Sequence, residues 1–82
     1  MDLKEKAKQK KIEDLFPGTL KRYGNVLRGL CPLHQDKSNP NFTIYPETNS
    51  WYCFAEGNGG DVITFWMLYK NVDFKQAIRE LS

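Results

Sequence analysis

Residue types that can bind a metal ion occur in two short pairs along this chain of 82 residues. Cys31 and His34 are separated by two residues, the spacing by which one turn presents two ligands to a tetrahedral ion. Cys53 and Glu56 repeat that spacing after eighteen intervening residues. Because thiolate and imidazole groups favour zinc over magnesium or calcium, the pattern predicts a zinc site built from these four residues.

Other roles for the two cysteines stay open at this point. Cys31 and Cys53 could form a disulfide, but a secreted scaffold of this size usually carries more cysteines. They could also be small buried apolar residues, with His34 an ordinary polar residue. The paired spacing favours the metal site over both alternatives, although structural zinc sites are usually completed by cysteine or histidine rather than by a carboxylate such as Glu56.

The segments around these pairs have the patterns of short strands. Residues 25–30 are apolar enough for a strand that leads directly into Cys31. Alternation of side chains in residues 42–45 and 51–54 predicts a hairpin. The glycine cluster at 57–60 predicts a flexible loop after its second strand.

Helical patterns occupy the two ends of the chain. Residues 2–15 mix charged residues with a thin apolar stripe, which predicts one helix that ends at the following Pro-Gly pair. Residues 62–70 are apolar almost all round, which predicts a buried helix capped by Asp61. A last helix begins at Asn71 or Asp73. Its apolar face is formed by residues at helical spacing: Phe74, Ala77, Ile78 and Leu81.

Size and composition indicate one soluble domain. A chain this short buries only roughly 60% of the surface that it exposes when unfolded, so a metal staple would help it fold. Hydrophobic residues make up 40% and charged residues 27%, which argues against both a disordered chain and a membrane protein. No apolar run approaches the roughly 20 residues of a membrane span, so we expect a cytoplasmic protein with no membrane partner.

The positive charge of the chain is concentrated at its start. The formal net charge is +2, and five of the twelve basic residues lie within residues 1–11. These residues predict a basic leader, helical in form, that precedes a domain at residues 12–82. Such a run can bind nucleic acid non-specifically, but it is more commonly a solvated helix face.

Taken together, the motifs resemble the Cys-His-Cys-Cys zinc-binding domain of bacterial and phage DNA primases. The resemblance covers about residues 12–82 and keeps the order of the family's motifs. Four strings carry it: Leu30-Cys-Pro-Leu-His34, Asp36-Lys-Ser-Asn-Pro-Asn-Phe42, Trp51-Tyr-Cys-Phe54 and Gly57-Asn-Gly-Gly-Asp-Val-Ile63. It implies an α+β fold like a zinc ribbon, a small antiparallel sheet with the metal at one end and helices packed around it.

The resemblance also assigns the metal ligands. Cys31, His34 and Cys53 match three of the family's ligands, and Glu56 stands where the family has its last cysteine. This departure leaves three arrangements open: a zinc site with glutamate as fourth ligand, a three-ligand site completed by water, and a domain that has dispensed with metal.

The function implied by the resemblance is binding of the single-stranded DNA template during RNA primer synthesis in replication. The chain lacks the clustered acidic residues with which primases hold catalytic metal, so we expect no enzymatic activity of its own. The expected partners are single-stranded DNA and a primase catalytic domain, or a separate polymerase or helicase. The chain would then be a domain of a larger primase or a short protein of a phage or mobile element.

Single-strand binders combine cations that contact phosphates with aromatic rings on which bases stack. The expected stacking rings are Tyr45, Trp51 and Tyr52. The expected phosphate contacts are Arg28, Lys37, Lys21 and Arg22. The remaining rings are expected in the core of so small a domain: Phe42, Phe54, Phe65, Trp66 and Phe74.

Two other functions compete with DNA binding. A structural or protein-docking zinc module of a phage or mobile-element replication complex is favoured by the near-neutral charge of residues 12–82. A strong salt dependence of DNA affinity would instead favour template binding. A catalytic zinc site has little support, because Glu56 is the one candidate general base beside the cysteine pairs.

Overall fold

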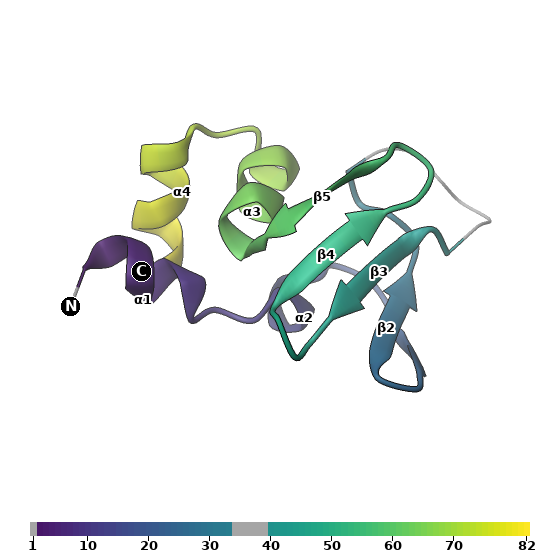
Figure 1. The fold of residues 1–82 in the computed structure, drawn as a ribbon. Helices are drawn as coiled ribbons and strands as arrows, with labels where there is room; N and C mark the ends of the chain where they lie inside the picture. The colour runs from purple at the N-terminus through teal and green to yellow at the C-terminus, as the bar shows by residue number, and fades with distance from the viewer. Residues whose placement is uncertain (1, 34–39) are drawn as a thin grey trace.

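An antiparallel sheet organises the computed structural model, which describes residues 2–33 and 40–82 (Figure 1). Within these residues five strands lie in the order β1-β2-β3-β4-β5, so each strand pairs with the next one along the chain. The strands are β1 Lys21–Tyr23, β2 Val26–Gly29, β3 Phe42–Tyr45, β4 Ser50–Cys53 and β5 Asn58–Asp61. The predicted strand within residues 25–30 and the predicted hairpin are confirmed, and so is the α+β fold class.

Strand β1 was not predicted from the sequence. It pairs with β2 through a two-residue turn at Gly24 and Asn25, with Tyr23 opposite Val26. Gly24 has a φ of 63°, and a glycine at the first position is the requirement of a tight hairpin turn of this kind. The strand sequence Lys-Arg-Tyr is polar and lacks the alternation of apolar and polar residues that indicates a strand, so the sequence did not predict this hairpin.

The prediction of a flexible loop at 57–60 is wrong, because Asn58–Asp61 forms strand β5. Gly59 lies opposite Tyr52 of β4. A Cβ atom at Gly59 would lie 2.7 Å from the carbonyl oxygen of Trp51 and 2.7 Å from the ring of Tyr52. The absence of a side chain at Gly59 therefore allows β5 to lie close to β4, and this glycine does not provide loop flexibility.

The single helix expected over residues 2–15 is also wrong. It is divided into α1 Leu3–Lys8 and α2 Ile12–Leu15. The side chain of Asn49 occupies the break: its Nδ2 donates to the carbonyls of Lys8 (3.2 Å) and Lys10 (2.7 Å), and its Oδ1 accepts from the N–H of Ile12 (3.1 Å). A distant side chain thus bonds the backbone groups that a continuous helix would pair internally.

The two C-terminal helices follow the sequence closely. They are α3 Val62–Lys70 and α4 Phe74–Leu81, and none of the helices in the described residues is long and apolar enough to cross a membrane. Asp61 caps α3 by accepting from the N–H of Thr64 at 2.8 Å, and Asp73 caps α4 by accepting from the N–H of Gln76 at 2.8 Å. The predicted burial of α3 holds for only part of it, since Leu68 is 50% exposed.

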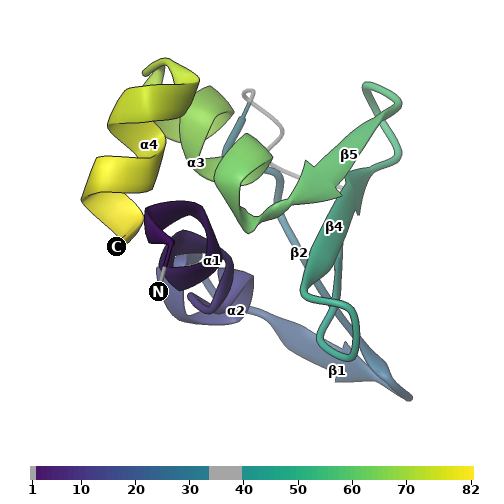
Figure 2. The same ribbon diagram turned by 60° about the vertical axis from the view of Figure 1, so that its left-hand side comes forward.

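Helices α1, α3 and α4 gather on one side of the molecule (Figure 2). Helix α1 packs against α4 and α3, and its Ala7 is fully buried. Three of the five basic residues expected in the leader, Lys4, Lys6 and Lys8, thus belong to a helix packed on the rest of the fold. The division of the chain at residue 11 stays a prediction.

The sheet presents two different faces. In-register pairs place Phe42 beside Cys53 and Ile44 beside Trp51 on the face turned toward α3, which we call the inner face. All four of these side chains are buried. The opposite, outer face is covered by none of the described helices (Figure 2). Because side chains alternate along a strand, each residue's face follows from this register.

Candidate metal centre and nucleic-acid interface

The two cysteines lie at the same end of the sheet. Cys53 ends β4 and is paired with Phe42 at the start of β3, which is paired in turn with Gly29 at the end of β2. Cys31 follows Gly29 by two residues and so lies just beyond that same end. Both cysteines are buried, at 3% and 1% exposure, and neither is in a disulfide in the described part of the chain.

The turn between β4 and β5 carries the second predicted pair. It is closed by the N–H of Gly57, which donates to the carbonyl of Cys53 at 2.8 Å, and Gly57 has a φ of 72°. The N–H of Phe54 donates to the carbonyl of Asn41 at 2.9 Å, which ties the turn to the start of β3. Glu56 is exposed within this turn, where its Oε2 accepts from Asn58 Nδ2 at 3.3 Å.

The structure brings together only part of the predicted ligand set. His34 and the predicted phosphate contact Lys37 lie outside the described residues. Within residues 2–33 and 40–82, no three His, Cys, Asp or Glu side chains are grouped as they would be around a metal ion, so Glu56 is not grouped with the two cysteines. Two buried thiols at one end of a sheet nevertheless fit the soft-ligand chemistry of zinc.

A row of side chains crosses the outer face. Register places Lys21 beside Arg28, Arg28 beside Thr43, and Thr43 beside Tyr52, with Gly59 at the far end. Lys21 and Arg28 are exposed, and Tyr52 is 36% exposed. Cations therefore lie at one end of this row and a phenol ring lies at the other. Thr43 between them is buried, and its Oγ1 has no hydrogen-bond partner among the described residues.

Of the rings expected on the surface, Trp51 is a clear correction. It is 2% exposed, its ring stacks on Phe42 with centroids 5.3 Å apart, and its Nε1 donates to the carbonyl of Asp61 at 2.9 Å. Trp51 and Tyr52 are neighbours in one strand, so they face opposite sides of the sheet and only Tyr52 lies on the outer face. Tyr45 is half-buried.

Phe54 is one of two rings that were wrongly predicted to lie in the core. It is 57% exposed and meets Tyr52 edge-on, with ring centroids 4.8 Å apart. Phe74, also expected in the core, is 43% exposed on α4. Phe54 stands two residues beyond Tyr52, and that alternation was the available signal for a shared face. The pair forms the aromatic end of the outer face.

The cationic end also differs from expectation. Alternation along β1 places Arg22 on the face opposite to Lys21, and Arg22 is paired with Leu27 of the inner side. Arg22 therefore does not continue the row of Lys21 and Arg28. Tyr23, which was not singled out in the sequence, is 50% exposed, and the Arg28 guanidinium lies 5.4 Å from its ring centroid. This contact holds a cation against an exposed ring.

The family model described as the CHC2 zinc finger matches residues 2–82. The chain belongs to this family. Zinc is the metal that the family's description indicates, in agreement with the cofactor expected from the cysteine and histidine spacing. The match includes α1, which the resemblance drawn from residues 12–82 left out.

Curated relatives of this CHC2 zinc-finger chain are DNA primases. The primase of Pseudomonas putida is 41% identical over 63 residues, which are 77% of this chain and 9% of that protein. The primase of Geobacillus stearothermophilus is 40% identical over 63 residues, 77% of this chain and 10% of that protein. The chain thus spans about a tenth of the length of the relatives that it matches.

A solved structure has the same fold. It is the Aquifex aeolicus primase, comprising zinc-binding and RNA polymerase domains, which superposes with a TM-score of 0.82 at 32% identity. The similarity covers 96% of this chain and 20% of the Aquifex chain. The sheet and the packed helices are therefore those found in a primase structure that includes a zinc-binding domain.

Proposed function

We propose that this chain is a zinc-stabilised module that binds single-stranded DNA template for RNA primer synthesis and has no catalytic activity of its own. The observation that carries the proposal is the row across the outer face, with Lys21 and Arg28 at one end and Tyr52 and Phe54 at the other. Cations that contact phosphates and rings that stack on bases are the two components of sequence-tolerant single-strand binding.

The proposed zinc ligands are Cys31, His34, Cys53 and Glu56. Zinc held by these residues would link the segment after β2 to the β4–β5 turn. Cys53 begins the closed β4–β5 turn through its carbonyl bond to Gly57, so its backbone is fixed without metal. Glu56 is exposed, and its carboxylate would have to turn away from Asn58 to act as the fourth ligand.

Zinc content is tested by native mass spectrometry of the purified chain with and without a chelator. We expect one zinc ion per chain, lost in Cys31→Ser and in Cys53→Ser together with a lowered melting temperature, because structural zinc contributes folding free energy. A wild type without metal, or serine variants that melt like the wild type, would contradict the proposed site.

DNA binding is tested by fluorescence anisotropy with a labelled single strand. Each base stacked on a ring contributes roughly 1–3 kcal/mol, so Tyr52→Ala and Phe54→Ala should each weaken binding at least severalfold. Both rings are exposed, so these variants should fold. Leu68→Ala, at a 50% exposed residue of α3, is the matched control and should bind like the wild type.

The expected partner is a primase catalytic domain, on the same chain or separate, or a polymerase or helicase. A protein-docking module of a replication complex is the second candidate function. It is favoured by exposed apolar side chains on the helices, namely Leu3, Leu68 and Phe74. If Tyr52→Ala leaves DNA affinity unchanged while Leu68→Ala abolishes capture of the catalytic domain, docking replaces template binding.

A further inference from the structure

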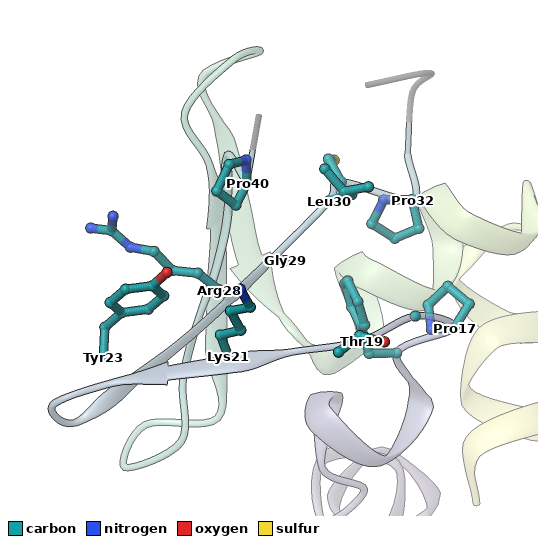
Figure 3. Close-up of a pocket in the computed structure, with 12 residues that line it drawn as sticks. Pro17, Thr19, Lys21, Tyr23, Arg28, Gly29, Leu30, Pro32 and Pro40 are labelled. Carbon is teal, nitrogen blue, oxygen red and sulfur yellow. The ribbon is translucent and has the colours of Figure 1, made fainter. Parts of the chain in front are cut away.

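A pocket of about 470 Å³ lies between the β1–β2 hairpin and the segment that leads from α2 into β1 (Figure 3). Its volume falls in the range of roughly 300–1,000 Å³ that is typical of small-molecule sites. We name it the Leu30 pocket, after an apolar side chain on its wall that is 44% exposed. Its lining residues in the described part of the chain include no carboxylate.

The floor of the Leu30 pocket is packed against the core. The Phe16 ring lies 5.4 Å from the ring of buried Phe42, measured between centroids. A Cβ atom at Gly29 would lie 2.9 Å from the carbonyl oxygen of Thr19 and 3.0 Å from the Phe16 ring, so glycine is needed for this close packing. The pocket is therefore a preformed feature of the fold and does not depend on surface side chains alone.

The rim of the Leu30 pocket is cationic and aromatic. Lys21 and Arg28 are paired in register across β1 and β2, and Tyr23 lies against the Arg28 guanidinium. Figure 3 shows Tyr23 and Arg28 together on one side, with Leu30 and Pro32 on the other. A ligand that fits this arrangement has an anionic group for the cations and a flat, largely apolar group for the interior.

We propose that the Leu30 pocket binds one nucleotide, with its base against Leu30 and Phe16 and its phosphate at Lys21 and Arg28. Arg28 also belongs to the outer-face row, so a strand that crosses the sheet can place one base in the pocket. The strand as the source of the nucleotide rests on the proposed function. A free nucleotide offers the same chemistry, and the experiment separates the two sources.

The first arm is methyl NMR of the whole chain with deoxyadenosine monophosphate, and with deoxyribose 5-phosphate as the probe without a base. The proposal expects deoxyadenosine monophosphate to shift the Leu30 methyls and the Tyr23 ring, while the sugar phosphate does not shift the Leu30 methyls. The methyls of Leu68, which is 50% exposed on α3 against 44% for Leu30, should stay in place with both probes. This arm needs no variant, so folding cannot confuse its result.

The second arm compares Leu30→Trp, which fills the pocket, with Leu68→Trp in binding an oligonucleotide of about twelve nucleotides, a length within known single-strand site sizes. Losing one stacked base should weaken binding about tenfold in Leu30→Trp alone. If deoxyadenosine monophosphate leaves the Leu30 methyls unshifted, the proposal that the pocket binds a nucleotide is refuted. The proposed function still stands in that case if the wild type binds the oligonucleotide. Shifted methyls in a chain that binds no strand contradict the proposed function and identify a free nucleotide as the ligand.

Discussion

Asn49 is predicted to be the residue whose side chain contributes most to joining the helices to the sheet. It lies in the β3–β4 loop with a φ of 51°, and its amide bonds the carbonyls of Lys8 and Lys10 and the N–H of Ile12. Each such hydrogen bond contributes about 1 kcal/mol net, and an alanine in the left-handed region costs about 1 kcal/mol more. Asn49→Ala should therefore lower the free energy of unfolding by about 4 kcal/mol, of which about 3 come from the hydrogen bonds and about 1 from the backbone.

Two further variants separate these contributions. Asn49→Gly keeps the left-handed backbone and loses only the side chain, so its loss should be about 1 kcal/mol smaller than that of alanine. Asn25→Ala, in the exposed β1–β2 turn, is the matched control and should change stability by less than about 0.5 kcal/mol.

The assay is denaturant unfolding followed by circular dichroism, with the free energy obtained by linear extrapolation. A loss of about 4 kcal/mol corresponds to a melting temperature lowered by more than about 15 °C in a domain of this size. An Asn49→Ala variant that unfolds within about 0.5 kcal/mol of the wild type would refute the reasoning, because the three bonds would then contribute nothing.

Three other predictions concern the metal, β5 and α4. Glu56→Cys should tighten zinc and Glu56→Ala should weaken it, as measured by chelator competition, and equal affinities would exclude Glu56 as a ligand. Gly59→Ala should destabilise the fold by about 1–3 kcal/mol in thermal unfolding, because its Cβ meets the Trp51 carbonyl oxygen at 2.7 Å. Hydrogen bonds from Gln76 and Trp66, with Lys70 nearby, hold the pKa of Glu80 below its ordinary value of 4.5. Stability from Glu80 is therefore present above pH 4.5 and lost as the pH falls through its lower folded pKa, so Glu80→Gln should make unfolding less dependent on acid, and an unchanged pH dependence would contradict this.

Local pattern predicted the elements whose cause is local. The strand before Cys31, the hairpin and the cap by Asp61 depend on alternation and on side chains within three residues of the groups they bond. The break between α1 and α2 has a distant cause, since Asn49 lies about forty residues away in the chain. No helix pattern in residues 2–15 contains that information.

In the candidate nucleic-acid interface, too, features with a local cause could be predicted and features with a distant cause could not. Strand alternation alone places Trp51 and Tyr52 on opposite faces of the sheet, so the prediction that both are exposed conflicts with the strand pattern itself. Burial of Trp51 on the inner face depends on α3 and β3, whose packing no local pattern gives. The Leu30 pocket is lined by residues of β1, of β2 and of the segment that follows α2. Because β1 was not among the predicted elements, the pocket could not be predicted either.

The central claim is that the outer face binds single-stranded DNA, and the salt dependence of affinity tests it most directly. We predict that log K falls linearly with log salt and that Arg28→Gln flattens this slope by about 0.7, the value for one phosphate contact on a single strand. Tyr52→Ala should lower affinity and keep the slope, since stacking releases no counterions. Because α1 packs on the fold, its contribution is controlled by Lys6→Gln with Lys8→Gln rather than by deletion. Binding that is lost in this α1 variant and unaffected by Arg28→Gln and Tyr52→Ala would contradict the account.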